Sequence, residues 1–460
     1  MIRVFRVHVA KPTLALGVFD GLFLFLSIAV GYGISQFDMS KALSAYRGQT
    51  TQILFYVAAI MVSLLMMGLY QRQFISDLKI ALLRLIASFA TAVLAMSIVF
   101  YVFPDVRIRM GALLPALAIG LCGTFLARMF FVRVADISAF KRRVLVFGTS
   151  GQAQEIETLE QGGGFMCVAF FQIGSEKPVV DRSRVLPCGA DLIDIINDLD
   201  VDEVVVALQE RRGAMPTNEL LACRMQGIQI SDFWTFMERQ KGQVELEALR
   251  PSWMIFSEGF SSRTRVQRMV KRIFDVAVSL LMLLFSLPVT TIAAVAVYLQ
   301  DRGPIFYRQE RVGLYGKPFY LLKFRSMRVD AEKDGVARWA ASNDTRVTPV
   351  GAFIRLTRID EIPQIYNVLR GEMSFIGPRP ERPSIVAELA KDIPFYNYRD
   401  AVKPGITGWA QINYSYGASV EDAKQKLKFD LFYIKNYSLM LDCLILLQTV
   451  RVVLWPQGVR

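Results

Sequence analysis

Residues 357–382 have the sequence TRIDEIPQIYNVLRGEMSFIGPRPER, in which two adjacent carboxylates, Asp360 and Glu361, lie between arginines. After this pair, apolar residues recur at helical spacing until Gly371, a residue typical of helix ends. Pro363 suits the first turn of a helix, where its missing N–H removes no hydrogen bond. The stretch therefore predicts a helix whose positive N-terminal end lies beside the carboxylates, where anions are stabilised.

A rigid turn follows this helix, because residues 377–380 are Gly-Pro-Arg-Pro and hold Arg379 between two prolines. Arg358 and Arg382 add guanidinium groups near the ends of the stretch. A carboxylate pair suits a hard cation and arginines suit phosphate, so these residues favour phosphoryl-transfer chemistry. A structural alternative also fits, in which the acids cap the helix and pair with nearby arginines. The rest of the chain decides between the two.

The composition is that of a membrane protein. Of its 460 residues, 53% are hydrophobic, and the net charge is +12. Such a length suggests roughly three domains, and so apolar a chain suggests membrane segments. The basic residues are dispersed and form no recognisable nucleic-acid module, which favours lipid headgroups and phosphates over nucleic acid as partners. The single histidine, His8, and five cysteines without CxxC spacing argue against histidine-based catalysis, a disulfide framework and a zinc site.

Four apolar runs come first, and each is about long enough to cross a bilayer core of roughly 30 Å. They cover residues 13–34, 51–70, 81–103 and 112–132. The first run lacks a small-residue cleavage site, so we expect a membrane helix rather than a cleaved leader. Basic flanks predict a four-helix transmembrane bundle at 1–140 with both ends in the cytoplasm. Asp20, inside the first run, is either a functional acid or the partner of a neighbouring helix.

Residues 141–250 alternate between short apolar runs and helical patterns, which predicts a parallel sheet in a Rossmann-like cytoplasmic domain. The phosphate fingerprint of such domains is degenerate here, because Gly148, Ser150 and Ala153 occupy its three glycine positions. Gln172 ends the second expected strand and offers no acid for a ribose. A structural or regulatory role is therefore favoured over dinucleotide binding.

The segment 251–270 is predicted to be a linker, and the apolar run 273–299 a re-entrant membrane helix rather than a span. Basic residues are dense on both sides of this run, which favours two ends at one membrane face. Ser286 and Pro288 lie within the run, where a proline supplies a break in the helix. We expect residues 271–460 to form a mostly helical catalytic domain.

Lys323 and Arg325 end an expected strand with the sequence PFYLLKFRSM. These two cations either reach a diphosphate or keep a strand edge soluble. The last part of the chain is apolar, with Lys435, Arg451 and Trp455 near its ends. This pattern predicts helices that dock on the catalytic domain or lie in the membrane interface.

Five segments of the C-terminal part resemble, in order, the successive signatures of the bacterial sugar transferase family, the monotopic phosphoglycosyl transferases. They are KRIFDVAVSLLMLLFSLPVT, DRGPIFYRQERVG, YLLKFRSM, RIDEIPQIYNVLRGEMSFIGPRPE and KPGITGWAQIN, and the resemblance covers residues 265–460. The preceding helices and sheet domain resemble the large form of this family, the polyisoprenyl-phosphate hexose-1-phosphate transferases of exopolysaccharide and O-antigen assembly.

The resemblance implies a multi-pass enzyme of the bacterial inner membrane whose catalytic domain lies on the cytoplasmic face. It would transfer a hexose-1-phosphate from a UDP-sugar, with glucose and galactose both open, to undecaprenyl phosphate and release UMP. The reaction would be ping-pong through a covalent phosphosugar intermediate. Membrane lipids are further implied partners, and a homodimer is left open.

The resemblance also implies roles for individual residues. Asp360 matches the nucleophile and would engage Mg²⁺, whereas Glu361 would assist by proton handling. Arg379 matches the phosphate-binding arginine, and Ser286 and Pro288 occupy the helix break with one residue between them. The other cations assigned to phosphate binding are Lys323, Arg325, Arg358 and Arg382.

Two other classes of protein remain to be separated from this one. A membrane-bound nucleotide-sugar dehydratase would need an intact glycine fingerprint and a Tyr-x-x-x-Lys pair, but none of the 16 tyrosines has a lysine four residues later. A non-catalytic scaffold or regulator of polysaccharide export would have no need of the carboxylate pair or the Pro-Arg-Pro turn.

Overall fold

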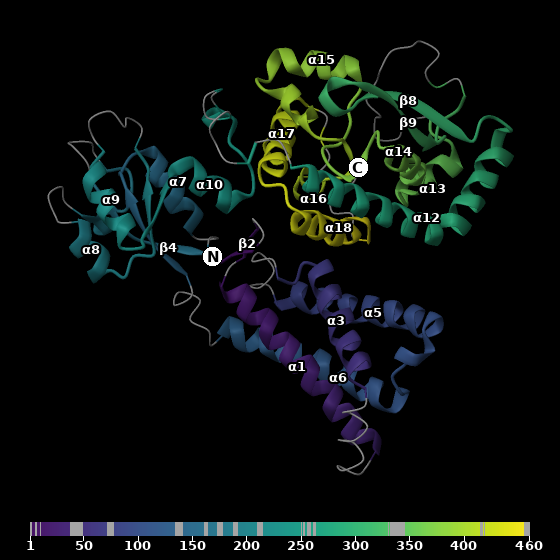
Figure 1. The fold of residues 1–460 in the computed structure, drawn as a ribbon, viewed down its shortest axis with the longest axis horizontal. Helices are drawn as coiled ribbons and strands as arrows, with labels where there is room; N and C mark the ends of the chain where they lie inside the picture. Colours follow the sequence, from purple (N-terminus) through teal and green to yellow (C-terminus); the bar gives the residue numbers. More distant parts are fainter. Residues whose placement is uncertain are drawn as a thin grey trace. The chain divides into compact units, whose positions relative to one another are not determined.

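The chain divides into two compact units, Met1–Lys241 and Gly242–Arg460, in the computed structural model. The elements of both units are coloured along the sequence in Figure 1. The structure describes residues 2–4, 7–9, 11–36, 49–70, 78–133, 141–160, 164–172, 178–186, 192–208, 215–249, 251, 254, 259–260, 264–329, 331, 346–414, 417 and 419–454.

Apolar helices dominate the start of the first unit, after a short antiparallel hairpin of β1 (Ile2–Val4) and β2 (Val7–Val9). The helices are α1 (Lys11–Gln36), α3 (Thr50–Met66), α5 (Leu78–Val102) and α6 (Met110–Arg133), with the single turn η1 (Pro104–Val106) before α6. The predicted apolar helices are thus confirmed. α1, α5 and α6 are long enough to cross a membrane, whereas α3, with 17 residues, falls short of the roughly 20 that a span needs.

The helix bundle is apolar on its outside as well as in its core. Leu24 and Tyr56 are fully buried between the helices, whereas Leu22, Leu83 and Leu114 are each well over half exposed. A helix that is hydrophobic on all sides is typical of a membrane span or of a large core. The exposed apolar faces of these helices therefore suggest association with a membrane.

Asp20 is held by neighbouring helices inside this bundle. Both of its carboxylate oxygens accept hydrogen bonds from Arg128, at 3.0 and 2.9 Å, and Tyr70 donates a third at 2.8 Å. Of the two interpretations of this acid, the structure supports the helix partner.

A five-stranded parallel sheet forms the rest of the first unit. Its elements are β3 (Arg142–Phe147), α7 (Gly151–Glu160), β4 (Phe165–Phe171), η2 (Arg182–Arg184), β5 (Val185–Leu186), α8 (Leu192–Asp198), β6 (Glu203–Val206), α9 (Thr217–Met225), β7 (Gln229–Asp232) and α10 (Phe233–Lys241). The strand order is β5-β4-β3-β6-β7, so the first strand of the domain is central and the chain winds outward in both directions. The alternating pattern therefore predicted the parallel sheet correctly.

The turn after β3 is shaped by packing. Gly148 has φ +127°, and a Cβ there would collide with the backbone of Ala207 at the end of β6. Ser150 donates a hydrogen bond of 3.3 Å from Oγ to the same carbonyl oxygen. Close approach of two strand ends thus explains this glycine without a phosphate.

A buried carboxylate, Glu203, begins β6. Arg239 donates to both of its oxygens at 2.7 Å, Arg142 lies 3.2 Å from Oε2, and Ser231 donates to Oε1 at 2.5 Å. The charge is therefore fully paired although Glu203 is completely buried.

The second unit begins with a connector, residues 242–249, that ends in the turn η3 (Leu246–Ala248). Trp409 donates from Nε1 to the carbonyl oxygen of Gly242 at 2.8 Å, and Lys428 binds Glu245 at 2.5 Å. The backbone N–H of Val244 also donates to Lys428, at 3.0 Å. These contacts tie residues 242–249 to the second unit, so the division between the two units falls between Lys241 and Gly242, ahead of the expected domain end at residue 250.

The second unit is mostly helical, as predicted, with two small sheets. β8 pairs with β9 in an antiparallel ribbon, and β10 pairs with β11 in parallel. Its elements are α12 (Arg265–Asp301), β8 (Phe306–Val312), η4 (Leu314–Gly316), β9 (Pro318–Phe324), α13 (Pro349–Leu356), η5 (Ile359–Gln364), α14 (Ile365–Arg370), β10 (Ser374–Ile376), α15 (Pro383–Asp392), η6 (Tyr396–Ala401), β11 (Gly405–Thr407), α16 (Trp409–Asn413), α17 (Val420–Lys435) and α18 (Leu439–Leu454).

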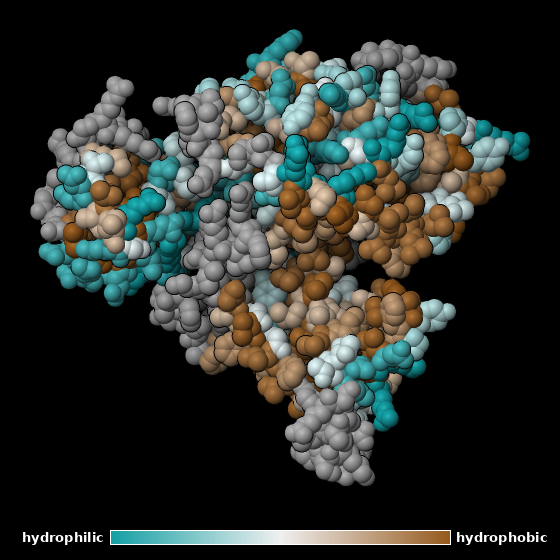
Figure 2. Space-filling model, viewed as in Figure 1, coloured by the Kyte–Doolittle hydropathy of each residue, from teal (hydrophilic) through white to brown (hydrophobic). Residues whose placement is uncertain are grey.

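The long helix α12 is anchored at both ends to this unit. Near its start, Arg272 donates to the backbone carbonyls of α14, and near its end Asp301 binds Arg325 after β9. Its middle is apolar and exposed, for example Leu284 and Phe285 at 67% each, and brown side chains mark it in Figure 2. The ribbon turns part of the way along α12 in Figure 1.

The predicted break at Ser286 and Pro288 is not an interruption of the helix. Pro288 lies inside one continuous 37-residue helix. Thr290 and Thr291 donate from their hydroxyls to the carbonyl oxygen of Leu287, at 3.0 and 2.8 Å. The helix is therefore continuous across Pro288, and the two threonine hydroxyls bond a carbonyl oxygen next to the proline.

Candidate active site

The antiparallel ribbon supplies one wall of the site. Arg311 of β8 is opposite Phe319, and Lys323 of β9 is opposite Tyr307. Because side chains alternate between the faces of a strand and opposite residues share a face, Arg311, Leu321 and Lys323 point to the same side. That side is the more buried one, so the ribbon carries two cations toward the interior of the unit.

The Gly-Pro-Arg-Pro turn is held in place by its backbone. Gly377 donates to the carbonyl oxygen of Thr407 at 2.9 Å, and Gly405 donates to that of Pro378 at 2.8 Å. The carbonyl oxygen of Arg379 accepts a 2.8 Å hydrogen bond from the buried Arg399, which also lies 3.0 Å from Asp430. These backbone contacts therefore fix the turn from which the Arg379 side chain extends.

Asp360 and Glu361 lie in η5, a 3₁₀ turn, and not in the first turn of an α-helix as predicted. The turn begins after Arg358, whose φ is +59°, and α14 starts only at Ile365. Pro363 has no N–H to close an α-helical turn there, which explains the delay. The predicted stop is confirmed, because Gly371 ends α14 with φ +84°.

The carboxylates are buried side by side but have different surroundings. Glu361 Oε1 accepts from Arg379 at 2.6 Å and from Lys323 at 3.2 Å, and Arg358 lies 3.7 Å away. Asp360 is only 8% exposed, yet its Oδ1 has no hydrogen-bond partner among the residues that the structure describes. Buried polar atoms are rarely left without a partner, so Asp360 is the unusual member of the pair.

The charges around the pair separate the two pKa values. Burial raises the pKa of Asp360, the neighbouring Glu361 raises it further, and Lys323 only partly offsets both effects. Burial would also raise the pKa of Glu361, but Arg379 and Lys323 together hold that pKa well below its usual range. Burial lowers the pKa of Lys323. The site thus combines an ionised, clamped Glu361 with a less acidic Asp360.

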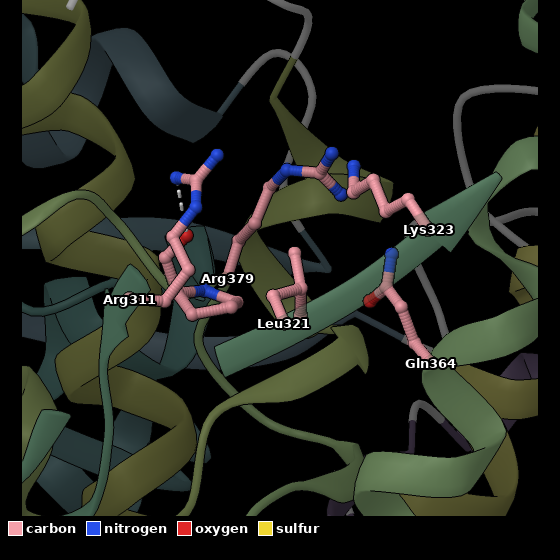
Figure 3. A pocket seen from close by; sticks show the side chains of 6 residues that line it. Arg311, Leu321, Lys323, Gln364 and Arg379 are labelled. Carbon is pink, nitrogen blue, oxygen red and sulfur yellow. Dashed lines mark hydrogen bonds between the residues drawn. The ribbon is translucent and has the colours of Figure 1, made fainter. Parts of the chain in front are cut away.

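A small pocket opens beside this pair. It is lined by Arg311, Leu321, Lys323, Gln364, Arg379 and Pro380. Figure 3 shows the guanidinium of Arg379 reaching toward Lys323, with Arg311 on the other side of the pocket. Three cations around one pocket favour an anion of high charge, such as a diphosphate.

Sequence reasoning missed Arg311 and Gln364 as pocket residues. Arg311 is one of the basic residues that follow the apolar run, and the register of β8 with β9 places it on the same face of the ribbon as Lys323. Gln364 lies at the end of the 3₁₀ turn. The α-helix that was expected over these residues gave no reason to place its side chain in the pocket.

The other predicted phosphate ligands have different positions. Arg325 is buried and binds Asp301 and the carbonyl oxygen of Val297, so it anchors α12. Arg382 is the N-cap residue of α15, after the Pro-Arg-Pro turn. Arg358 is 43% exposed at the edge of the carboxylate pair.

The residues present suit Mg²⁺ through a single carboxylate. No cluster of three His, Cys, Asp or Glu side chains occurs in the described part of the chain. Mg²⁺ usually keeps several waters and binds one or two carboxylates together with substrate phosphates. The unpartnered Oδ1 of Asp360 near a cation-lined pocket fits this ligand set.

Comparison with known proteins gives a consistent result. Residues 266–456 match the family described as bacterial sugar transferase. A UDP-N-acetylgalactosamine-undecaprenyl-phosphate N-acetylgalactosaminephosphotransferase of Aeromonas hydrophila is 38% identical over 260 residues, which are 56% of this chain and 60% of the relative. A UDP-glucose:undecaprenyl-phosphate glucose-1-phosphate transferase of Xanthomonas campestris is 34% identical over 311 residues, 63% of this chain and 61% of the relative.

A shorter relative is covered more fully. A UDP-glucose:undecaprenyl-phosphate glucose-1-phosphate transferase of Caulobacter vibrioides is 41% identical over 182 residues, 39% of this chain and 68% of the relative. By contrast, the chain spans only about three fifths of the Aeromonas and Xanthomonas relatives, at 60% and 61%.

Proposed function

Because the chain belongs to the bacterial sugar transferase family, we propose that it transfers a sugar-1-phosphate from a UDP-sugar to undecaprenyl phosphate and releases UMP. The observation that carries this proposal is the contrast within the carboxylate pair. Asp360 keeps an unpartnered oxygen beside a cationic pocket, whereas Glu361 is clamped by Arg379 and Lys323. A nucleophile needs such an available oxygen, and a transferred phosphoryl group needs such cations.

The reaction has two displacements at one phosphorus atom. A carboxylate oxygen of Asp360 attacks the β-phosphorus of the UDP-sugar, and the bond from that phosphorus to the bridging oxygen breaks, so UMP leaves with the electron pair. A phosphate oxygen of the lipid then attacks the phosphorus of the acyl phosphate on Asp360. The Asp360–phosphorus bond breaks, which gives the lipid diphosphate sugar and restores the carboxylate.

Glu361 handles the proton of the lipid phosphate in this scheme. While Arg379 and Lys323 neutralise it, Glu361 is a weak base. When substrate phosphates take up the charge of these cations, the pKa of Glu361 rises and the carboxylate can accept a proton. Asp360 would hold Mg²⁺ together with the diphosphate, and the ion would neutralise charge on the phosphates.

The membrane arrangement follows from α12. Both ends of this helix are anchored to one polar unit and its middle is exposed and apolar. This supports a re-entrant helix that holds the catalytic unit on the cytoplasmic face of the inner membrane, where nucleotide sugar and lipid phosphate meet. The sheet domain would then be a Rossmann-like, non-catalytic domain, since packing accounts for its glycine turn.

The sugar is best sought by experiment among a few candidates. The relatives are named for glucose and for N-acetylgalactosamine, so UDP-glucose, UDP-galactose and UDP-N-acetylgalactosamine form the panel. The product would start the repeat unit of an exopolysaccharide or O-antigen.

The decisive test is UMP release from these UDP-sugars by membranes that contain the full chain and added undecaprenyl phosphate. Asp360→Asn should lower the rate by at least about 10³-fold, because an amide is not a nucleophile here. Asp392→Asn, at an exposed acid ending α15, is the matched control and should keep wild-type activity. Wild-type protein given UDP-sugar alone should gain the mass of one sugar phosphate, and Asp360→Asn should not. A wild type that releases no UMP from any sugar would support a scaffold instead.

A further inference from the structure

Three cations, Lys323, Arg379 and Arg311, line the pocket beside the carboxylate pair. Lys323 and Arg311 lie four residues apart in the register of the ribbon, which is about 14 Å between their Cα atoms at 3.4 Å per residue. Arg379 lies between them (Figure 3). Lys323 and Arg379 share Glu361 as a partner, whereas Arg311 has its own acid, Glu381, at 3.4 Å. The cations therefore form two groups along one pocket.

Arg311 is held firmly but incompletely satisfied. It donates from Nη1 to the carbonyl oxygen of Pro380 at 3.0 Å and from Nη2 to Gln309 at 2.6 Å. Its Nε is buried without a hydrogen-bond partner among the described residues. The Arg311 side chain is 16% exposed, and the positive charges of Arg379 and Arg382 repel its guanidinium. A bound anion would relieve this crowding of positive charge.

The direction of attack decides which anion belongs there. In phosphoryl transfer, the nucleophile and the leaving oxygen are roughly in line on opposite sides of the phosphorus. Asp360 is next to Glu361, which contacts Lys323 and Arg379, and the charges of these two cations also act on the Asp360 carboxylate. The carboxylate pair therefore lies with the Lys323 and Arg379 group of cations. A phosphorus held at Arg379 and attacked from Asp360 therefore has its leaving group directed toward Arg311.

We propose that Arg311 binds the α-phosphate of the UDP-sugar and stabilises the departing UMP, which gives the first half-reaction a phosphate site of its own. This assignment rests on the proposed function. Undecaprenyl phosphate brings one phosphate to the same Asp360 and has no second phosphate for Arg311. The two substrates should therefore depend on Arg311 to very different degrees.

The experiment measures both substrates on the full chain in membranes. In Arg311→Gln, the inhibition constant of UMP should rise, and kcat/KM for the UDP-sugar should fall, by at least about tenfold, as expected for the loss of one hydrogen bond to a charged group. The KM for undecaprenyl phosphate should stay within about twofold of wild type. Arg308→Gln is the matched control, because Arg308 is exposed on the opposite face of the same strand.

Several results would overturn the assignment. An unchanged inhibition constant for UMP refutes it, as does a rise in the KM for undecaprenyl phosphate alone, which would place the lipid phosphate at Arg311. Equal loss of kcat/KM for the UDP-sugar and for undecaprenyl phosphate, with unchanged UMP inhibition, would refute the assignment and mean that Arg311 only positions the Pro380 turn. If Arg311→Gln does not accumulate, Arg311→Lys should still weaken UMP inhibition, and unchanged inhibition in that variant refutes the assignment. Failure of wild-type protein to release UMP would instead overturn the proposed function.

Discussion

Two buried carboxylate clusters in this chain have similar composition and opposite character. Glu203 in the sheet domain and Glu361 in the catalytic unit each lie against two strong cations. Around Glu203, both carboxylate oxygens accept hydrogen bonds, and the hydroxyl of Ser231 donates one of them. Around Glu361, a pocket opens and the adjacent Asp360 keeps an oxygen without a described partner.

Satisfaction of the carboxylate oxygens, and not burial of charge, separates the two clusters. A fully paired buried charge contributes to a unique fold, and removal of one partner strands the others. An incompletely paired cluster leaves hydrogen-bonding capacity for a ligand. Stability should therefore depend on Glu203 and catalysis on Asp360 and Glu361, and this division can be tested by substitution.

The largest effect on folding should come from Glu203→Gln. Loss of this charge leaves Arg142 and Arg239 without their acid, which should lower the free energy of unfolding of the sheet domain by about 3–5 kcal/mol. Hydrogen exchange of the β3 and β6 amides in the full chain measures it. Glu155→Gln removes an acid that is 47% exposed and pairs with Lys241, so its effect should stay below about 1 kcal/mol. Equal hydrogen-exchange protection of the β6 amides in the Glu203 variant and in wild type would contradict a stabilising role of Glu203.

Glu361→Gln should act on the reaction and on its pH dependence. The rate should fall by about 10²-fold, as for the loss of one proton-transfer group. Because the charge of Glu361 adds to burial in raising the pKa of Asp360, its removal should lower that pKa. Asp360 must be ionised to attack, so the rate falls as the pH drops through its pKa, and this acid limb should move to lower pH in the variant. The pH profile of kcat/KM for the UDP-sugar shows it, and a limb that stays or moves upward contradicts this arrangement of charge.

The smallest effect should come from Arg358→Gln. Arg358 lies 3.7 Å from Glu361 and is 43% exposed, so solvent screens its charge. Activity should remain within about threefold of wild type, a loss typical of an exposed ion pair. UMP release is the measurement. A loss of activity as large as that of Glu361→Gln would show that Arg358 acts together with Lys323 and Arg379.

Much of this architecture could be predicted from the sequence. Glu361 and Arg379 are 18 residues apart, and a helix closed by Gly371 followed by a proline-fixed turn brought them together as expected. Alternating apolar runs predicted the parallel sheet, because buried parallel strands are short and continuous in hydrophobicity. Lys323 lies 3.2 Å from Glu361, so it is beside the carboxylate pair, and its contact with phosphate stays a prediction.

Other features depend on contacts that are distant in the sequence. Arg325 resembles Lys323 in composition and position, but Asp301 at the end of α12 captures it. The 3₁₀ turn around Asp360 follows from Pro363 and from the left-handed Arg358 together, and helical spacing alone does not reveal it. Arg311 entered the site only because β8 pairs with β9 in one particular register.

The docked connector has a practical consequence for building chimaeras. Gly242 has φ +66°, and a Cβ there would lie 3.3 Å from the indole of Trp409, whose N–H donates to the carbonyl oxygen of Gly242. A foreign amino-terminal module should therefore be spliced on before Gly242. A splice at residue 264 would discard residues 242–249 and leave the indole N–H and the Lys428 ammonium to find new acceptors in water.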